Sequence, residues 1–124
     1  MACANKVGGV AFLKVDGRQY LLRGDLTVSP DPYERTGVAG QDGIHGYTES
    51  PRVPWITATI TDTGGLSLAE FQRMTCVTVM CELNNGKHYV LVEAWTAEAR
   101  ELKTQEGSME LRWEGLYCEE VLAA

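Results

Sequence analysis

The chain has 124 residues, a length that suits one hydrophobic core, so we expect a single domain spanning residues 1–124. Hydrophobic residues make up 44% of it and charged residues 23%, which excludes the apolar-poor, highly charged composition of disordered chains. A formal net charge of −6 argues against a protein that grips nucleic acid over a broad surface.

The sequence pattern contains neither a membrane span nor a zinc motif. No run approaches the ~20 consecutive apolar residues of a membrane helix, and Met1–Gly9 lacks the apolar core of a signal peptide. We therefore expect cytoplasmic synthesis and no membrane anchor. The four cysteines form no C-x-x-C pair, so we expect free, partly buried thiols. They are Cys3, Cys76, Cys81 and Cys118.

The first elements in chain order are two strands joined by a tight turn. Val10–Val15 is rich in β-forming residues and ends at Asp16-Gly17, which suits the positive φ angles of a two-residue hairpin. The next strand, about Arg18–Ser29, alternates apolar and polar residues, so one of its faces should be buried. The apolar positions are Tyr20, Leu22, Leu26 and Val28. Prolines 30 and 32 then end the strand.

Residues 37–54 are dominated by glycine and proline, with Ile44 and Tyr47 as almost the only large apolar side chains. This composition predicts a long extended loop. Loops of such length are uncommon in a small domain and are usually either mobile or used for contact with another molecule. The segment is therefore the first functional clue in the chain.

One helix and four further strands complete the pattern. Ser67-Leu68-Ala69-Glu70 matches a capping box and predicts a short helix over Leu68–Met74. Strands are expected at Val53–Thr61, Cys76–Leu83, Lys87–Lys103 and Met109–Glu114, with turns at 62–65, 84–86 and 105–107. In the longest strand, Tyr89, Leu91 and Trp95 should share one face and Val90, Val92 and Ala94 the other, so its middle should be covered on both sides. Four residues of Cys76–Leu83 should point inward: Val77, Val79, Cys81 and Leu83. Ile56, Ala58 and Ile60 should share one face of their strand, and Met109, Leu111 and Trp113 alternate with charged residues in the last strand.

Such a run of hairpins predicts a mainly β fold: an antiparallel β-sandwich or partly closed barrel with one short helix and a long extended loop. Exposed strand edges invite pairing with another chain. Charge is also uneven, since residues 1–81 have 8 acidic and 7 basic side chains and residues 82–124 have 9 acidic and 4 basic. The acidic part is either a solubilising face or a surface that repels a polyanion. A self-assembling β protein fits both observations.

No residue pattern indicates catalysis, a cofactor or a metal ion. His45 lies near Asp42 and Glu49, but this spacing is more typical of a solvated loop histidine than of an acid–base cluster. The three tryptophans are interpreted as core or interface anchors rather than as ligand-stacking groups. They are Trp55, Trp95 and Trp113. The sequence therefore predicts no catalytic, cofactor-binding or metal-binding residues.

Seven segments form a recognisable pattern over nearly the whole chain. They are Val15–Tyr20, Arg23–Pro30, Gly37–Tyr47, Pro51–Pro54, Asp62–Ser67, Glu82–Lys87 and Glu93–Glu98. None is a catalytic motif, and the specificity lies in their order and spacing. In this pattern the chain resembles the tail tube protein of Mu-like, contractile-tailed bacteriophages.

The resemblance implies a structural protein of the virion tail, made in the host bacterial cytoplasm. It implies hexameric rings that stack into a rigid hollow tube inside a contractile sheath, through which DNA passes during ejection without specific binding. The implied partners are further copies of the chain and the tail sheath, baseplate and tail terminator proteins. The resemblance implies no cofactor.

Two sets of residues are candidates for assembly and DNA transit. If the loop contacts an adjacent subunit or ring, its contact residues are Val38, Gly40, Asp42, Ile44, His45, Tyr47 and Arg52. DNA must slide without being trapped by phosphate-binding groups, so we expect a polar strand face of net negative charge to line the lumen. The candidates are Glu98, Glu101, Glu110 and Glu114, partly offset by Arg112.

Two alternatives stay open. A tube subunit of a related contractile injection device, a tailocin, would share the fold and the assembly, and the sequence pattern fits both. A small β-barrel binding module of the OB or SH3 type would account for the strands and aromatics, but the acidity counts against a nucleic-acid ligand. An enzyme is disfavoured because the sequence has no cofactor fingerprint and no catalytic triad pattern.

Overall fold

The computed structural model describes residues 11–62, 64, 66–83, 86–99 and 101–122. These residues form eleven strands and one short helix. In chain order they are β1 (Ala11–Val15), β2 (Arg18–Tyr20), β3 (Leu22–Ser29), β4 (Tyr33–Gly40), β5 (Gly43–Pro51), β6 (Trp55–Thr61), α1 (Leu68–Gln72), β7 (Val77–Leu83), β8 (His88–Glu98), β9 (Leu102–Lys103), β10 (Ser108–Glu114) and β11 (Tyr117–Val121).

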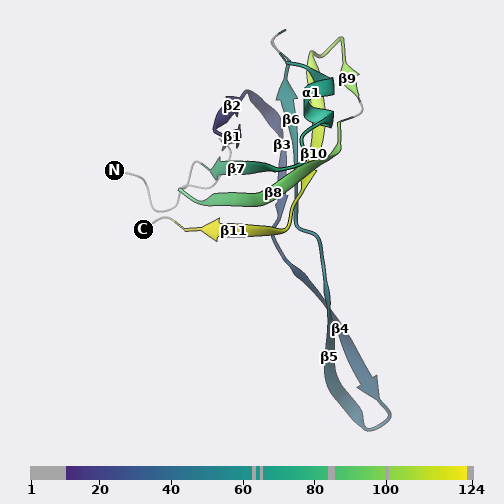
Figure 1. Ribbon diagram of the computed structural model, residues 1–124. Helices are drawn as coiled ribbons and strands as arrows, with labels where there is room; N and C mark the ends of the chain where they lie inside the picture. Colours follow the sequence, from purple (N-terminus) through teal and green to yellow (C-terminus); the bar gives the residue numbers. More distant parts are fainter. Residues whose placement is uncertain (1–10, 63, 65, 84–85, 100, 123–124) are drawn as a thin grey trace.

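One curled antiparallel sheet forms the body, in the order β2-β1-β7-β8-β10-β6-β3. The long strand β8 joins its two halves, since β8 pairs with β7 and β11 near its start and with β10 near its end. Figure 1 shows β7, β8 and β11 running across the upright strands β3, β6 and β10. The expected mainly β fold, a sandwich or partly closed barrel with one short helix, is confirmed as this half-barrel.

The bend in β8 lies at Glu93, whose φ of 50° falls in the left-handed region. The register against β7 shifts there, which marks a β-bulge that re-aims the side chains beyond it. As a result, Leu91 and Ala94 are both fully buried, whereas Trp95 is only half-buried. The expected faces of this strand are therefore wrong for Trp95 and Ala94, because the bulge reverses the alternation. Its middle is also less covered than expected on the second face, where Val90 and Val92 are only half-buried.

The core is closed by a side chain of the helix. Phe71 of α1 is buried and contacts Tyr20 of β2 and Trp113 of β10, with ring centroids 5.3 and 6.4 Å apart. It therefore touches both halves of the sheet. The apolar faces expected of β6 and β10 are the buried ones, since each of their residues is at most 3% exposed: Ile56, Ala58, Ile60, Met109, Leu111 and Trp113.

The helix begins where the capping pattern predicts. Ser67 is the N-cap, and its Oγ accepts a hydrogen bond from the backbone N–H of Glu70 at 3.3 Å. The helix ends at Gln72, two residues before the expected Met74. The side-chain amide of Gln72 donates to the carbonyl oxygen of Ala99 at 2.8 Å, which ties the helix to the end of β8.

Two expected strands are divided in the structure. The strand expected at Arg18–Ser29 breaks at the exposed Leu21, because β2 pairs with β1 whereas β3 pairs with β6. The strand expected at Lys87–Lys103 breaks at the buried Ala99 into β8 and β9. The sequence pattern also misses β11, which is held by pairing with β8 and lacks a fully buried residue.

Residues 37–54, expected as an extended loop, lie mostly in a β-hairpin. Strands β4 and β5 pair with each other from Tyr33 and Pro51 to Gly40 and Gly43, and Figure 1 shows the ribbon projecting away from the body. Every residue of both strands is exposed. The loop prediction is corrected for this reason: neither face is buried, so no apolar alternation marks the strands.

The first turn is confirmed, since Asp16 and Gly17 have φ angles of 50° and 81° and join paired residues of β1 and β2. Parts of other expected elements lie outside the described residues. These are Val10, Thr63, Gly65, Asn84 and Asn85.

The three described cysteines are free thiols, as expected, and Cys3 lies outside the described residues. Cys76 is exposed, Cys81 is buried and Cys118 is half-buried. Burial raises the pKa of the Cys81 thiol to about 12, with a further contribution from Cys118. Burial also raises the pKa of Cys118 to about 11, assisted by the carboxylates of Glu119 and Glu120.

These thiols should differ in reactivity, because only the thiolate is alkylated. At pH 8, well below the raised pKa values, Cys81 and Cys118 stay protonated. Iodoacetamide should therefore label Cys76 first and Cys81 only after unfolding, as measured by mass spectrometry of a Cys3→Ser variant. Equal labelling rates for Cys76 and Cys81 in the folded protein would contradict the burial of Cys81.

The corner between β10 and β11 requires a glycine. A Cβ atom at Gly115 would lie 2.8 Å from Cγ of Leu91 and 3.0 Å from the carbonyl oxygen of Val92. Gly115→Ala should therefore lower the free energy of unfolding by about 1–3 kcal/mol, measured by urea denaturation. Gly37→Ala is the matched control, since a Cβ there meets no atom within 4 Å and should change stability by less than about 0.5 kcal/mol. Equal effects would rule out the tight corner.

Candidate functional site

The residues considered for catalysis do not converge. The Nε2 atom of His45 lies 2.7 Å from Oδ1 of Asp42, whereas Glu49 instead accepts a hydrogen bond from Arg35 at 2.9 Å. The hydrogen bond from His45 lowers the pKa of Asp42 below its ordinary value. Across the described residues, no group of three or more His, Cys, Asp and Glu side chains could hold a metal ion. In that same part of the chain, no helix is long and apolar enough to cross a membrane.

The projecting hairpin has two unlike faces, which follow from its register because paired residues share a face. Tyr33, Ile44 and Tyr47 lie on one face and are 48%, 82% and 63% exposed. The ion pair of Arg35 and Glu49 lies on this same face, and the guanidinium carbon of Arg35 is 5.5 Å from the centroid of the Tyr47 ring. We call this surface the hairpin apolar face. The opposite face is made mostly of threonine and glycine.

The hairpin is anchored at its base by Arg52. Its guanidinium donates hydrogen bonds to the carbonyl oxygen of Asp31 and to Oγ of Ser29, and its backbone N–H donates to the carbonyl oxygen of Pro32. Of the seven candidate contact residues, Arg52 is thus half-buried and engaged at the base. The other six are exposed along the strands and tip: Val38, Gly40, Asp42, Ile44, His45 and Tyr47.

The tip depends on glycines. A Cβ at Gly40 would lie 2.4 Å from Cε1 of His45, so the imidazole ring packs directly on the glycine backbone. Gly43 and Gly46 both have φ of 138°, which disfavours other residues at these positions. The imidazole is thus held between the Gly40 backbone and the Asp42 carboxylate.

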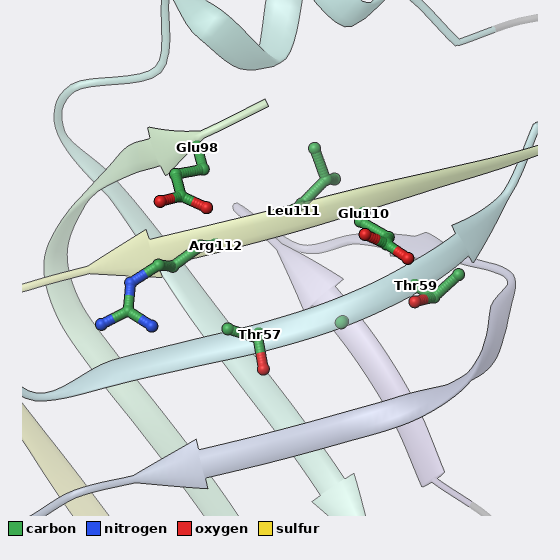
Figure 2. A pocket seen from close by; sticks show the side chains of 7 residues that line it. Thr57, Thr59, Glu98, Glu110, Leu111 and Arg112 are labelled. Carbon is green, nitrogen blue, oxygen red and sulfur yellow. The ribbon is translucent and has the colours of Figure 1, made fainter. Parts of the chain in front are cut away.

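Four of the five lumen candidates gather on the outer face of β8, β10 and β6. Figure 2 shows Glu98, Glu110 and Arg112 around a pocket of about 230 Å³, beside Thr57 and Thr59. Strand register explains the grouping, because Arg112 lies opposite both Glu98 and Thr57, and Glu110 lies opposite Thr59. We call this surface the charged face.

The cations of the charged face are already engaged. The Arg112 guanidinium lies 3.4 Å from a carboxylate oxygen of Glu114, the fourth candidate, and 4.5 Å from the centroid of the Trp55 ring. The Nζ atom of Lys103 lies 2.8 Å from Oε1 of Glu110. Sequence reasoning missed Lys103, since the pairing of β9 with β10 brings it there. Glu101, the fifth candidate, is exposed in the connection between β8 and β9.

The tryptophans divide between core and surface. Trp113 is fully buried, in agreement with a core role. Trp55 at the start of β6 and Trp95 near the end of β8 are half-buried. Both lie in register with Glu114 of β10.

Comparison with known proteins gives a consistent result. Residues 4–120 match the family model described as "Phage tail tube protein". The chain is 28% identical over 118 residues to the Mu-like prophage FluMu tail tube protein of Haemophilus influenzae, an alignment that covers 95% of this chain and 98% of that protein. It is 27% identical over 94 residues to the tail tube protein of Escherichia phage Mu, covering 76% of this chain and 79% of that protein.

Among solved structures, the fold is similar to a chain in the sheath-tube complex of an extracellular contractile injection system, PVC, in its extended state. The TM-score is 0.63 at 10% sequence identity, and the match covers 91% of this chain and 88% of that chain. At this identity the likeness concerns the fold alone.

Proposed function

The chain belongs to the phage tail tube protein family and is a structural subunit of the virion tail tube, and we propose that its copies close into hexameric rings that stack into the hollow tube. The observation that carries this proposal is the β4–β5 hairpin. Its strands of eight and nine residues are wholly exposed and extend roughly 26 Å from the body. A two-stranded ribbon of this kind is marginally stable by itself, so contact with another copy accounts for it.

Ring closure is supported by the open edges of the sheet. In the described part of the chain, β3 is the last strand at one end of the sheet order and β11 pairs only with β8. Unpaired edge strands are an aggregation hazard that closure into a ring removes. We propose that edge pairing joins neighbouring copies within a ring, while the hairpin reaches an adjacent subunit or ring through Val38, Gly40, Asp42, Ile44, His45 and Tyr47. Arg52 then sets the direction of the hairpin.

The charged face is our candidate for the lumen wall. It combines the carboxylates of Glu98, Glu110 and Glu114 with the cations Arg112 and Lys103, each of which is within 3.4 Å of a carboxylate oxygen. A cation paired in this way has less attraction left for a DNA phosphate. The face would therefore let DNA slide without binding it. We include the exposed Glu101 in this wall as well.

The proposed partners are those of a tube inside a contractile sheath: the tail sheath, baseplate and tail terminator proteins. The similarity of the fold to a chain of a sheath-tube complex supports the sheath. We propose that the chain acts as one domain, is made in the host bacterial cytoplasm and catalyses no reaction. Family membership favours this tube subunit over the small β-barrel binding module considered above.

A tube subunit of a contractile injection device is the second candidate. The observation that favours it is the same similarity of fold to an extracellular contractile injection system. The relatives, which are named as tail tube proteins of a Mu-like prophage and of phage Mu, favour the phage tail, and their alignments cover more than three quarters of this chain.

Assembly is testable by negative-stain electron microscopy over a concentration series. The intact chain should form rings or hollow tubes. Deletion of Gly43–Tyr47 should abolish tubes yet leave the thermal unfolding of the subunit nearly unchanged, because every residue of β4 and β5 is exposed. Tubes of normal length from the deletion variant would refute the role of the hairpin. An intact chain that stays monomeric even with baseplate and sheath proteins added would refute the tube.

The lumen assignment is testable in virions. Glu110→Lys combined with Glu114→Lys should leave assembly intact but slow DNA ejection several-fold, because unpaired ammonium groups bind phosphates. Fluorescence of a DNA-binding dye measures the ejection rate, and added salt should partly restore it. The matched control is Glu110→Gln with Glu114→Gln, which removes charge without adding cations and should eject faster than the lysine variant. Equal ejection rates for all three proteins would place the lumen on another face.

A further inference from the structure

A second apolar surface lies on the outer side of β1, β7, β8 and β11. Its members point away from the buried residues of the same strands, such as Leu13, Val79 and Leu91. Phe12, Tyr117 and Val121 are between 43% and 47% exposed, and the remaining members are half-buried. The whole set, which we call the outer apolar face, is Phe12, Met80, Val90, Val92, Tyr117 and Val121.

This surface contrasts with the charged face on the other half of the sheet. Cross-strand register places Met80 beside Val90, where a solvent-facing sheet would normally present polar side chains. The central charges are Lys14 and Glu82, which pair with each other at 3.0 Å. Contiguous apolar surface of this kind marks a site of contact with another molecule. An apolar surface is a poor lining for a water-filled channel, so we expect another protein surface to cover this face.

The hairpin apolar face has matching properties. It presents Ile44 and Tyr47, and its charges, Arg35 and Glu49, also pair with each other at 2.9 Å. Each surface thus combines apolar side chains with one internally neutralised ion pair, so neither member of that pair would be desolvated without its partner. On the outer apolar face, the cross-strand register places the exposed Glu119 of β11 opposite Val90, and His88 opposite both Glu82 and Val121, so these two polar side chains lie beside the apolar members.

The two surfaces cannot serve each other within one subunit, because the hairpin projects away from the body (Figure 1). Their size fits a contact between copies. The hairpin apolar face presents alternate residues of strands that are eight and nine residues long, a small patch suited to a contact that is repeated from copy to copy. A second copy of this chain is therefore the occupant that both surfaces favour.

We propose that the hairpin apolar face of one copy docks on the outer apolar face of the next copy, with Ile44 and Tyr47 against Met80 and Val90. This inference rests on the proposed function, since it names the surface that receives the hairpin. The contact is head-to-tail: each junction leaves one hairpin and one face unused, so it can be repeated from copy to copy rather than closing as a symmetric dimer. The charged face stays free to line the lumen.

The test mixes two variants that each lack one side of the junction. The hairpin variant carries Ile44→Glu and Tyr47→Glu. The face variant carries Met80→Lys and Val90→Glu, which places opposite charges directly across two strands and so preserves pairing. Neither variant alone should form tubes. An equimolar mixture should form one junction per pair, so that mass photometry detects a species of twice the mass found for either variant alone.

The matched control is Thr36→Lys with Thr48→Glu, a cross-strand pair on the opposite face of the hairpin, which should form tubes like the intact chain. A face variant that forms normal tubes, or a mixture that shows no doubling, would overturn the inference and leave the proposed function standing. Normal tubes that no longer bind sheath protein would also overturn it, by assigning the face to the sheath. Absence of tubes from the intact chain would instead contradict the proposed function.

A second measurement needs no destabilising change. Tyr47→p-benzoylphenylalanine introduces a photo-crosslinker at an exposed position, and tubes of this variant can be irradiated and mapped by mass spectrometry. Crosslinks to β7 or to the first half of β8 in a different copy are expected, and mixing isotope-labelled with unlabelled chains identifies them as intermolecular. Crosslinks confined to other surfaces would overturn the inference even if the face variant failed to fold.

Discussion

The architecture depends on one irregularity, the β-bulge at Glu93 in the middle of β8. Because the strand bends there, its first part pairs with β7 and β11 and its last part pairs with β10. A single strand thereby belongs to both halves of the sheet, a common way to turn a corner between crossed sheets. The chain then passes from β10 to β11 through Gly115, whose missing side chain leaves room for Leu91. Without the bend, the two halves could not enclose a common core.

The same bend separates two outer faces of different chemistry. One carries threonines and paired charges around Arg112, and the other carries Met80 and Val90 with a single neutralised ion pair. A subunit of a water-filled tube needs both kinds of surface. A polar surface stays hydrated where it faces the channel, whereas burial of an apolar surface under another copy lowers the free energy of the assembly. The sharing of β8 is what allows a chain of 124 residues to present both.

The β4–β5 hairpin makes no contribution to the core, because all residues of its two strands are exposed. Its stability within the subunit comes from backbone pairing, the Arg35–Glu49 ion pair and the Arg52 anchor at its base. Exposed ion pairs contribute little, so most of the order of this ribbon must come from pairing and from what it contacts. That dependence is consistent with the proposed contact between the hairpin and another copy of the chain.

Sequence alone determined the features that depend on local periodicity and turn chemistry: the inward faces of β6 and β10, the Asp16-Gly17 turn, the Ser67 cap and the family pattern. Tertiary structure decided the rest. The bulge at Glu93 turned Trp95 away from Leu91, and pairing partners divided the strand at Leu21 and recruited β11. The sequence pattern also did not predict the hairpin within residues 37–54 or the approach of Lys103 to Glu110. The physical reason is the same throughout: apolar alternation records which side chains meet the chain's own core, whereas strand pairing is made by backbone groups that every residue shares.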